Sequence, residues 1–183
     1  MPSSLKLVIL DRDGVINYDS DQFIKSPAEW KPIPGSLEAI ATLTHSGFRV
    51  VVCSNQSGIG RGLLDMSALN AINDKMYKAL AVLGGRIDAL FYCPHPAETG
   101  CECRKPKPGM YLDIARRFNV NLTGVPSVGD SLRDLQAAAN VGCQPMLVLT
   151  GKGRKTRSAG GLPESTRVFD DLAAAVRSII AGQ

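Results

Sequence analysis

The chain has 183 residues, of which 44% are apolar and 21% charged, with a formal net charge of +4 and a mean hydropathy of 0.00. This length supports one full hydrophobic core rather than two, and no apolar run is long enough to span a membrane. Aromatic residues make up only 5% of the chain, which argues against the base-stacking surfaces of a nucleic-acid-binding protein.

We therefore expect one domain over residues 1–183 that acts on a small anionic molecule, without nucleic acid or membrane partners. A monomer is the expected state. We expect the cytoplasm as its location, because no signal-peptide pattern opens the chain.

Short apolar runs alternate with helical patterns along the chain. Strands are predicted over residues 5–10, 48–53, 89–92, 126–129 and 146–150. Helices are predicted over about 36–46, 67–83, 109–118, 131–140 and 170–180. Continuous apolar strands separated by helices predict an α/β fold, in which helices cover both faces of a parallel sheet.

Two long segments fall outside these elements. Residues 14–35 hold Trp30 among several prolines, and we expect a small β-like flap over the site with Trp30 as its anchor; a packed surface tryptophan is the alternative. Residues 151–164 are rich in glycine, serine and basic residues, so a surface loop is predicted there.

Reactive side chains follow the predicted strands. Residues 11–13, 54–58 and 129–134 come after the first, second and fourth strands, and the third strand leads into residues 93–108, which include Arg104 and Lys105. In a parallel α/β sheet, ligands bind beyond the carboxyl ends of the strands. These segments therefore predict a single site at that edge.

Asp11 and Asp13 lie directly after the first predicted strand. Side chains two residues apart on an extended chain point the same way, so both carboxylates can converge on one volume. Mg²⁺ can compensate their repulsion, because it favours oxygen ligands and is commonly held by carboxylates together with a substrate phosphate. The alternative is a solvated Asp-x-Asp turn.

This arrangement predicts phosphoryl transfer through a covalent aspartyl phosphate. Asp11 is the predicted nucleophile. Asp13 is predicted to protonate the leaving alcohol and then to activate the water that hydrolyses the intermediate.

Other polar residues at this edge are predicted to stabilise the transferred group. The hydroxyl of Ser54 and the backbone N–H of Asn55 are predicted to contact phosphoryl oxygens, and Lys105 is the predicted permanent cation. Asp130 is predicted to complete the Mg²⁺ site, with Asp134 one turn later as an outer or alternate ligand.

Four metal-binding side chains occur close together in the segment 93–108: Cys93, His95, Cys101 and Cys103. One imidazole and three thiolates match the closed tetrahedral set of a structural Zn²⁺ site. The alternatives are a loop with reduced thiols and, less compatible with a cytosolic chain, a disulfide. A structural zinc is predicted to hold Arg104 and Lys105 at the edge of the sheet.

Between about residues 5 and 150 these motifs resemble the haloacid dehalogenase superfamily of phosphatases, and within it the heptose 1,7-bisphosphate phosphatase family. The resemblance lies in residues 11–17, 54–58, 93–95, 101–106 and 129–130. It implies a Rossmann-like three-layer fold with a minimal cap, Mg²⁺ and a structural Zn²⁺ loop over about residues 93–108. It also implies removal of the 7-phosphate of D-glycero-D-manno-heptose 1,7-bisphosphate, a step toward lipopolysaccharide or other surface glycans.

The resemblance also implies roles for individual residues. The implied Mg²⁺ ligands are Asp11, Asp13 and Asp130. The implied substrate-binding residues are Asp19, Ser20, Asp21, Gln22, Ser54, Asn55, Gln56, Ser57, Arg104 and Lys105. Ser54 replaces the threonine that is frequent in the family, which keeps the hydroxyl.

Two other functions remain compatible with these residues. A histidinol-phosphate phosphatase shares the Asp-x-Asp chemistry and the Cys/His loop, and differs in the leaving group. A zinc-stabilised module that binds nucleic acid or protein belongs to another class, which the convergence of catalytic segments and the absence of a clustered basic face disfavour.

Overall fold

The computed structural model describes residues 5–182, so residues 1–4 and 183 of the predicted domain lie outside the described part, and one domain over 1–183 stays a prediction. Its strands form one parallel sheet in the order β3-β2-β1-β4-β5-β6. The strands are β1 (Leu7–Leu10), β2 (Arg49–Asn55), β3 (Ala89–Cys93), β4 (Pro126–Gly129), β5 (Gln144–Val148) and β6 (Arg167–Phe169).

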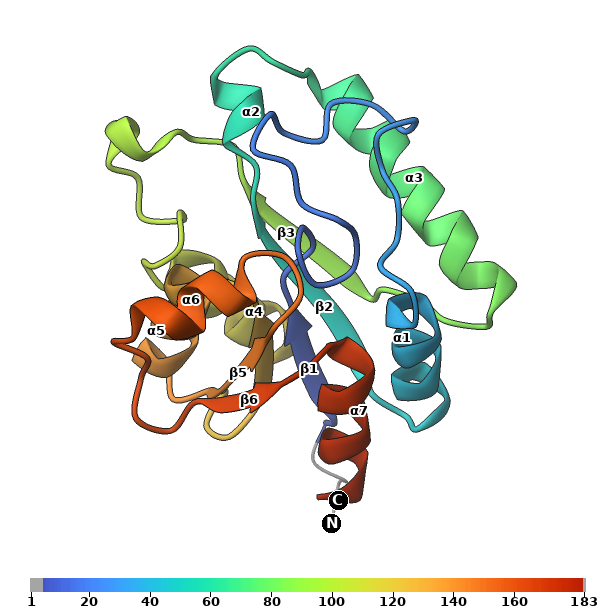
Figure 1. Cartoon of the computed structure of the whole chain (residues 1–183), viewed down its shortest axis with the longest axis vertical. Coiled ribbons are helices and arrows are strands. Elements are labelled where there is room, and N and C mark those ends of the chain that lie inside the picture. Colours follow the sequence, from blue (N-terminus) through green and yellow to red (C-terminus); the bar gives the residue numbers. More distant parts are fainter. Residues whose placement is uncertain (1–4, 183) are drawn as a thin grey trace.

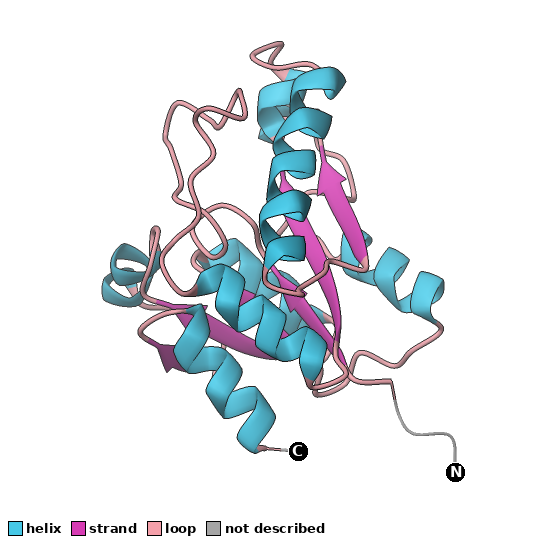
Figure 2. Cartoon of the chain, turned by 90° about the vertical axis from the view of Figure 1, so that its right-hand side faces the viewer, coloured by secondary structure: helices cyan, strands magenta, loops and turns pink. Residues whose placement is uncertain are grey.

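Helices cover both faces of this sheet (Figures 1 and 2). They are α1 (Ser36–His45), α2 (Ser57–Gly60), α3 (Met66–Val82), α4 (Gly109–Phe118), α5 (Leu132–Asn140), α6 (Gly153–Ala159) and α7 (Leu172–Ala181), with a 3₁₀ turn at Ala97–Thr99. None of the helices within residues 5–182 has the length and apolarity needed to cross a membrane.

Side chains of β1 alternate between the two faces of the sheet and contribute to a separate core cluster on each face. Val8 and Leu10 pack in one cluster with residues of α1, α3 and α7. Leu7 and Ile9 point to the opposite face and pack with residues of α4 and α5. Because successive side chains of a strand point to opposite faces, a continuous apolar strand is buried on both sides, as a parallel sheet requires.

The α/β sheet predicted from sequence is confirmed, with small shifts at element ends. β6 was not predicted because it is only three residues long and carries Arg167. The predicted surface loop over 151–164 is wrong, since α6 occupies much of it. This helix has no apolar stripe to reveal it, and Gly153 lets it approach β5 closely, because a Cβ there would lie 1.7 Å from the carbonyl oxygen of Val148.

The segment between β1 and α1 passes over the carboxyl ends of the strands (Figure 1). The prediction of a small β-like flap is only partly met. Within this segment, two isolated β-bridges form, between Asp13 and Asn17 and between Asn17 and Pro32, and no strand. The predicted anchor is confirmed: Trp30 is 1% exposed. Lys75 of α3 donates to the backbone carbonyls of Pro27 and Trp30 at 2.6 and 3.0 Å. Residues 19–21, 23 and 24 of this loop line the cavity at the strand ends, and no separate cap domain occurs within residues 5–182.

Candidate active site

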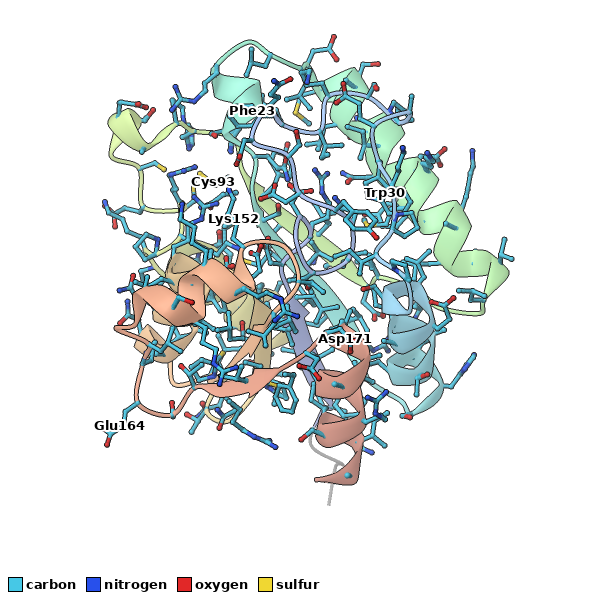
Figure 3. All side chains as sticks on the ribbon, viewed as in Figure 1. Phe23, Trp30, Cys93, Lys152, Glu164 and Asp171 are labelled. Carbon is cyan, nitrogen blue, oxygen red and sulfur yellow. The ribbon has the colours of Figure 1, made fainter. Side chains whose placement is uncertain are left out.

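A cavity of about 410 Å³ lies at the carboxyl ends of the strands. Its acidic members are Asp11, Asp13, Asp19, Asp21, Asp130 and Asp134. Its basic members are Arg61, Arg104, Lys105, Arg133 and Lys152. Phe23 and Lys152 line this cavity. Figure 3 shows both, together with Cys93, in the upper part of the view, above Glu164 and Asp171. The segments predicted to converge here do so.

Lys105 is buried between two of the carboxylates. Its Nζ lies 3.2 Å from Asp11 Oδ1 and 2.7 Å from Asp134 Oδ1, and it donates to the carbonyl oxygen of Cys53 at 2.6 Å. Asn55 holds the lysine backbone, because its side chain accepts from the Lys105 N–H and donates to the Lys105 carbonyl, both at 3.1 Å. The end of β2 thus positions a fixed cation beside the predicted nucleophile.

Asp13 lies in a different environment. Arg12 donates to its two carboxylate oxygens at 3.0 and 3.2 Å, and the side chains of Asn17 and Gln56 donate at 2.8 and 3.0 Å. Burial acts to raise the pKa of Asp13, but the Arg12 charge and these hydrogen bonds outweigh it and lower that pKa. Asp13 is therefore held as a well-oriented carboxylate.

Asp130 fits into a space that two glycines leave open. A Cβ at Gly14 would lie 2.0 Å from Asp130 Oδ2, and one at Gly151 would lie 2.3 Å from the same atom. Both glycines have positive φ, at +86° and +54°, a conformation that glycine adopts at little cost. The backbone N–H of Lys152 donates to this Asp130 oxygen at 2.8 Å.

The carboxylates of Asp11, Asp130 and Asp134 lie within 4.8 Å of one another. Burial, followed by the charge of Asp134, raises the pKa of Asp11 well above its usual value and that of Asp130 to about 7. Burial would also raise the pKa of Asp134, but Lys105 overrides it and lowers that pKa. This concentration of negative charge, with Lys105 as its buried counter-ion, fits a divalent cation with oxygen ligands.

Asp134 was expected as an outer or alternate ligand. In the structure its carboxylate lies in the same group as those of Asp11 and Asp130. The Asp13 carboxylate is not part of this group, because its oxygens are turned to Arg12, Asn17 and Gln56. A role for Asp13 as a Mg²⁺ ligand stays a prediction.

The end of β2 and the residues that follow it supply polar groups close to Asp13. Ser54 is 2% exposed and its Oγ accepts from Gln56 Nε2 at 2.7 Å. Asn55, Gln56 and Ser57 line the cavity, at the start of α2. Their predicted contacts with substrate stay predictions.

Most of the segment 19–22 lines the cavity. Asp19, Ser20 and Asp21 belong to its lining, whereas Gln22 lines only a neighbouring hollow, which Asp19 and Ser20 also border. Lys152, at the turn after β5, lies 3.2 Å from Asp19 Oδ2 and 3.6 Å from Asp21 Oδ1.

The predicted zinc ligands converge. Contacts between Cys93, His95, Cys101 and Cys103 through sulfur and Nδ1 span 2.9 to 3.6 Å. None of the cysteines in the described part of the chain forms a disulfide. The group, hereafter the Cys/His cluster, fits a closed tetrahedral Zn²⁺ site. Arg104 donates to the carbonyl oxygen of His95 at 3.3 Å, which ties this cation to the cluster.

Five lining residues were not predicted individually: Phe23, Ile24, Arg61, Arg133 and Lys152. A signal existed for two of them. Arg133 falls within the predicted segment 129–134, and Lys152 follows the fifth strand closely, so both are near carboxyl ends of strands. The other three carry no such signal.

Comparisons with known proteins identify the family. The family model for polynucleotide kinase 3 phosphatase matches residues 6–137, and a HAD-hydrolase-like model matches residues 102–175. A Bordetella bronchiseptica protein named D-glycero-beta-D-manno-heptose-1,7-bisphosphate 7-phosphatase is 63% identical over 96% of this chain and 98% of its own length. A Pseudomonas putida protein of the same name is 53% identical over 96% of this chain and 100% of its own length.

Solved structures agree. The D,D-heptose 1.7-bisphosphate phosphatase of B. bronchiseptica, complexed with magnesium and phosphate, superposes with a TM-score of 0.97 at 62% identity, over 98% of this chain and 100% of that one. The corresponding phosphatase of Burkholderia thailandensis gives a TM-score of 0.78 at 55% identity, over 96% and 99%.

The parallel sheet, the carboxylates beyond its strand ends and these matches define a hydrolase of the HAD class. Within that class, the chain belongs to the family of D-glycero-beta-D-manno-heptose-1,7-bisphosphate 7-phosphatases.

Proposed function

We propose that this enzyme hydrolyses the 7-phosphate of D-glycero-β-D-manno-heptose 1,7-bisphosphate. The names of its relatives support the substrate. The observation that carries the chemistry is the Asp11 carboxylate beside the buried amino group of Lys105, in a cavity that also holds Asp130 and Asp134. The reaction belongs in the cytoplasm, in the synthesis of heptose for lipopolysaccharide precursors.

Asp11 acts as the nucleophile. Its oxygen forms a bond to the phosphorus while the bond from phosphorus to the C7 oxygen breaks, which leaves an aspartyl phosphate. Water then attacks the phosphorus, inorganic phosphate leaves and Asp11 is restored. Lys105 lines the cavity, and the buried hydroxyl of Ser54 contacts the lining residue Gln56. Both stabilise charge on the phosphoryl oxygens.

Asp13 transfers the protons in both steps. It gives a proton to the leaving C7 oxygen and later takes one from the attacking water. The lowered pKa of Asp13 in the free site suits the second step. The negatively charged phosphoryl group of the substrate raises that pKa when bound, which suits the first step.

Mg²⁺ is the cofactor that this site favours. Asp11 and Asp130 would hold it, with Asp134 beside them, and the fit rests on their mutual proximity and on the raised pKa values of Asp11 and Asp130. Bound there, Mg²⁺ supplies positive charge to the phosphoryl oxygens. A magnesium and phosphate complex of the B. bronchiseptica relative supports this assignment.

Zn²⁺ in the Cys/His cluster has a structural role. Four protein ligands leave no open position, so zinc there shapes the loop and does not activate water. Through the Arg104 contact with His95, it keeps Arg104 and the neighbouring Lys105 at the cavity.

The test is a steady-state panel of heptose 1,7-bisphosphate, fructose 1,6-bisphosphate and histidinol phosphate, each with and without Mg²⁺. We expect the highest kcat/KM for the heptose bisphosphate, and activity only with Mg²⁺. A tenfold preference for histidinol phosphate would replace the substrate assignment.

Asp11→Asn tests the mechanism. This variant should lose activity by about 1,000-fold or more, and should not retain radiolabel from phosphate-labelled substrate after rapid acid quenching. Asp74→Asn, an exposed change on α3, is the matched control and should behave as the parent enzyme. Full activity of Asp11→Asn would remove the proposed nucleophile.

A further inference from the structure

Arg133 lines the cavity and forms no ion pair among residues 5–182. It lies in the first turn of α5, and its Nε is buried with no hydrogen-bond partner in the described part of the chain. The adjacent Asp134 does not serve it, because the Asp134 oxygens are engaged by Lys105 and by Ser131. A buried donor left without a partner is unfavourable unless a ligand completes it.

Arg104 lines the same cavity. Within residues 5–182 its contact is the backbone carbonyl of His95, and it forms no ion pair. Both guanidinium groups therefore border one ligand volume without a carboxylate partner in the described part of the chain.

The other cations of the cavity have carboxylate partners. Arg61 pairs with Glu98 at 3.2 Å, and Lys152 pairs with Asp19 at 3.2 Å. Lys105 lies between Asp11 and Asp134. Arg104 and Arg133 differ from this pattern, because in the described part of the chain neither forms an ion pair, and both line the same cavity.

These two arginines favour an anion. Like charges that line one partly buried cavity cost free energy, and Arg133 also lies at the positive end of a helix. A phosphate would compensate these charges, because a planar guanidinium donates two parallel hydrogen bonds to phosphate oxygens. In the proposed function the phosphate under attack lies at Asp11 and Lys105. Neither arginine pairs with Asp11 within residues 5–182, so both guanidinium groups are available to another anion.

We propose that Arg133, together with Arg104, binds the second, non-reacting phosphate of a bisphosphate substrate and so selects bisphosphates over monophosphates. The proposal rests on the proposed function and deepens it. Arg133 is a specificity-determining residue that does not take part in bond breaking.

The test compares heptose 1,7-bisphosphate with heptose 7-phosphate, which lacks the second phosphate. Arg133→Gln should lower kcat/KM for the bisphosphate by about 10- to 100-fold, since a hydrogen bond between charged groups is lost, mainly through KM. For the monophosphate the change should stay below about threefold. Arg133→Lys should recover part of the loss, because it restores the charge without the planar fork.

Binding of products gives an independent measurement. Arg133→Gln should raise the inhibition constant of heptose 1-phosphate by about 10- to 100-fold and leave that of inorganic phosphate unchanged. Arg177→Gln, an exposed arginine on α7, is the matched control and should change neither constant.

The outcomes separate this proposal from the function on which it rests. If the parent enzyme does not hydrolyse the heptose bisphosphate, the proposed function fails and this proposal falls with it. If the parent does so, and Arg133→Gln weakens both substrates equally or neither, only the role of Arg133 is refuted. A selective loss on the bisphosphate supports both.

Discussion

Replacing Lys105 by methionine tests whether this cation stabilises the site as well as the reaction. The side chain is 2% exposed and its amino group contacts Asp11, Asp134 and the carbonyl oxygen of Cys53. Methionine preserves much of the length of the buried chain but removes the charge and its donors. The carboxylates of Asp11 and Asp134 would then face one another, and Asp130, without a buried counter-ion.

The expected loss of stability is large. Removing one partner of a buried ion pair costs about 3–5 kcal/mol, because the remaining charge stays buried and uncompensated. Mg²⁺ should offset part of this loss, since the variant site is more negative and binds the ion more tightly. A tenfold gain in Mg²⁺ affinity corresponds to about 1.4 kcal/mol at saturation.

Urea unfolding followed by tryptophan fluorescence is the appropriate assay. Trp30 is the single tryptophan of the chain and is 1% exposed, so its emission reports on the packed loop beside the site. Lys107→Met is the matched control two residues away. The Lys107 pair with Glu102 is exposed, at 44% and 85% for the two side chains, and should contribute less than about 1 kcal/mol.

A second substitution isolates the electrostatic cause. Lys105→Met combined with Asp134→Asn should recover part of the lost stability, because it removes one of the uncompensated charges while asparagine can still accept a hydrogen bond from Ser131. The reasoning is refuted if Lys105→Met and Lys107→Met lose equal stability, or if the double variant is as unstable as the single one in metal-free buffer.

Three further measurements test other parts of the structure. Because the pKa of Asp130 is raised to about 7, Mg²⁺ must displace a proton from this carboxyl group below that pH. Calorimetry should therefore show weaker Mg²⁺ binding at pH 6 than at pH 8. Equal affinities at the two pH values would contradict this. Cys101→Ser in the Cys/His cluster should lower zinc content by elemental analysis and reduce kcat/KM in saturating Mg²⁺; full activity without zinc would exclude the proposed role. Trp30→Ala should destabilise the fold by about 3–5 kcal/mol in calorimetric unfolding, whereas Tyr18→Ala, at a side chain that is 53% exposed, should cost less than about 0.5 kcal/mol.

The raised pKa of Asp130 also makes the stability of the metal-free fold depend on pH. The pKa of Asp130 in the folded protein is raised above the ordinary carboxyl value, so the metal-free fold is favoured by the protonated form and loses that advantage as the pH rises through about 7. Mg²⁺ should therefore raise the melting temperature more at pH 8 than at pH 6.

Local patterns were sufficient for much of the architecture. Buried strands such as β1 and β2 are continuous apolar runs, and α4 carries a clear apolar stripe, so period and composition predict them directly. The positions of Asp11, Asp13 and Asp130 just after strands were also enough to place them at one edge, because every strand of a parallel sheet points its carboxyl end the same way. The Cys/His cluster was visible as a spacing of metal-binding residues.

Other features depended on contacts between segments far apart in the chain. α6 has no apolar period, and it is held by contacts such as that of Thr156 with the carbonyl oxygen of Asp130. Lys105 and Ser131 hold Asp134 beside Asp11 and Asp130. The Asp13 carboxylate is bound instead by Arg12, Asn17 and Gln56.

The sequence by itself therefore determined strands β1 to β5, the helices α1, α3, α4, α5 and α7, and the chemical class of the site, because these follow from hydrophobic period, strand direction and residue type. Only the tertiary structure decided which charges are paired. Lys152 meets Asp19, whereas Arg133 and Arg104 meet no carboxylate in the described part of the chain. Pairing depends on the distances between side chains from separate elements, and those distances exist only once the chain is folded.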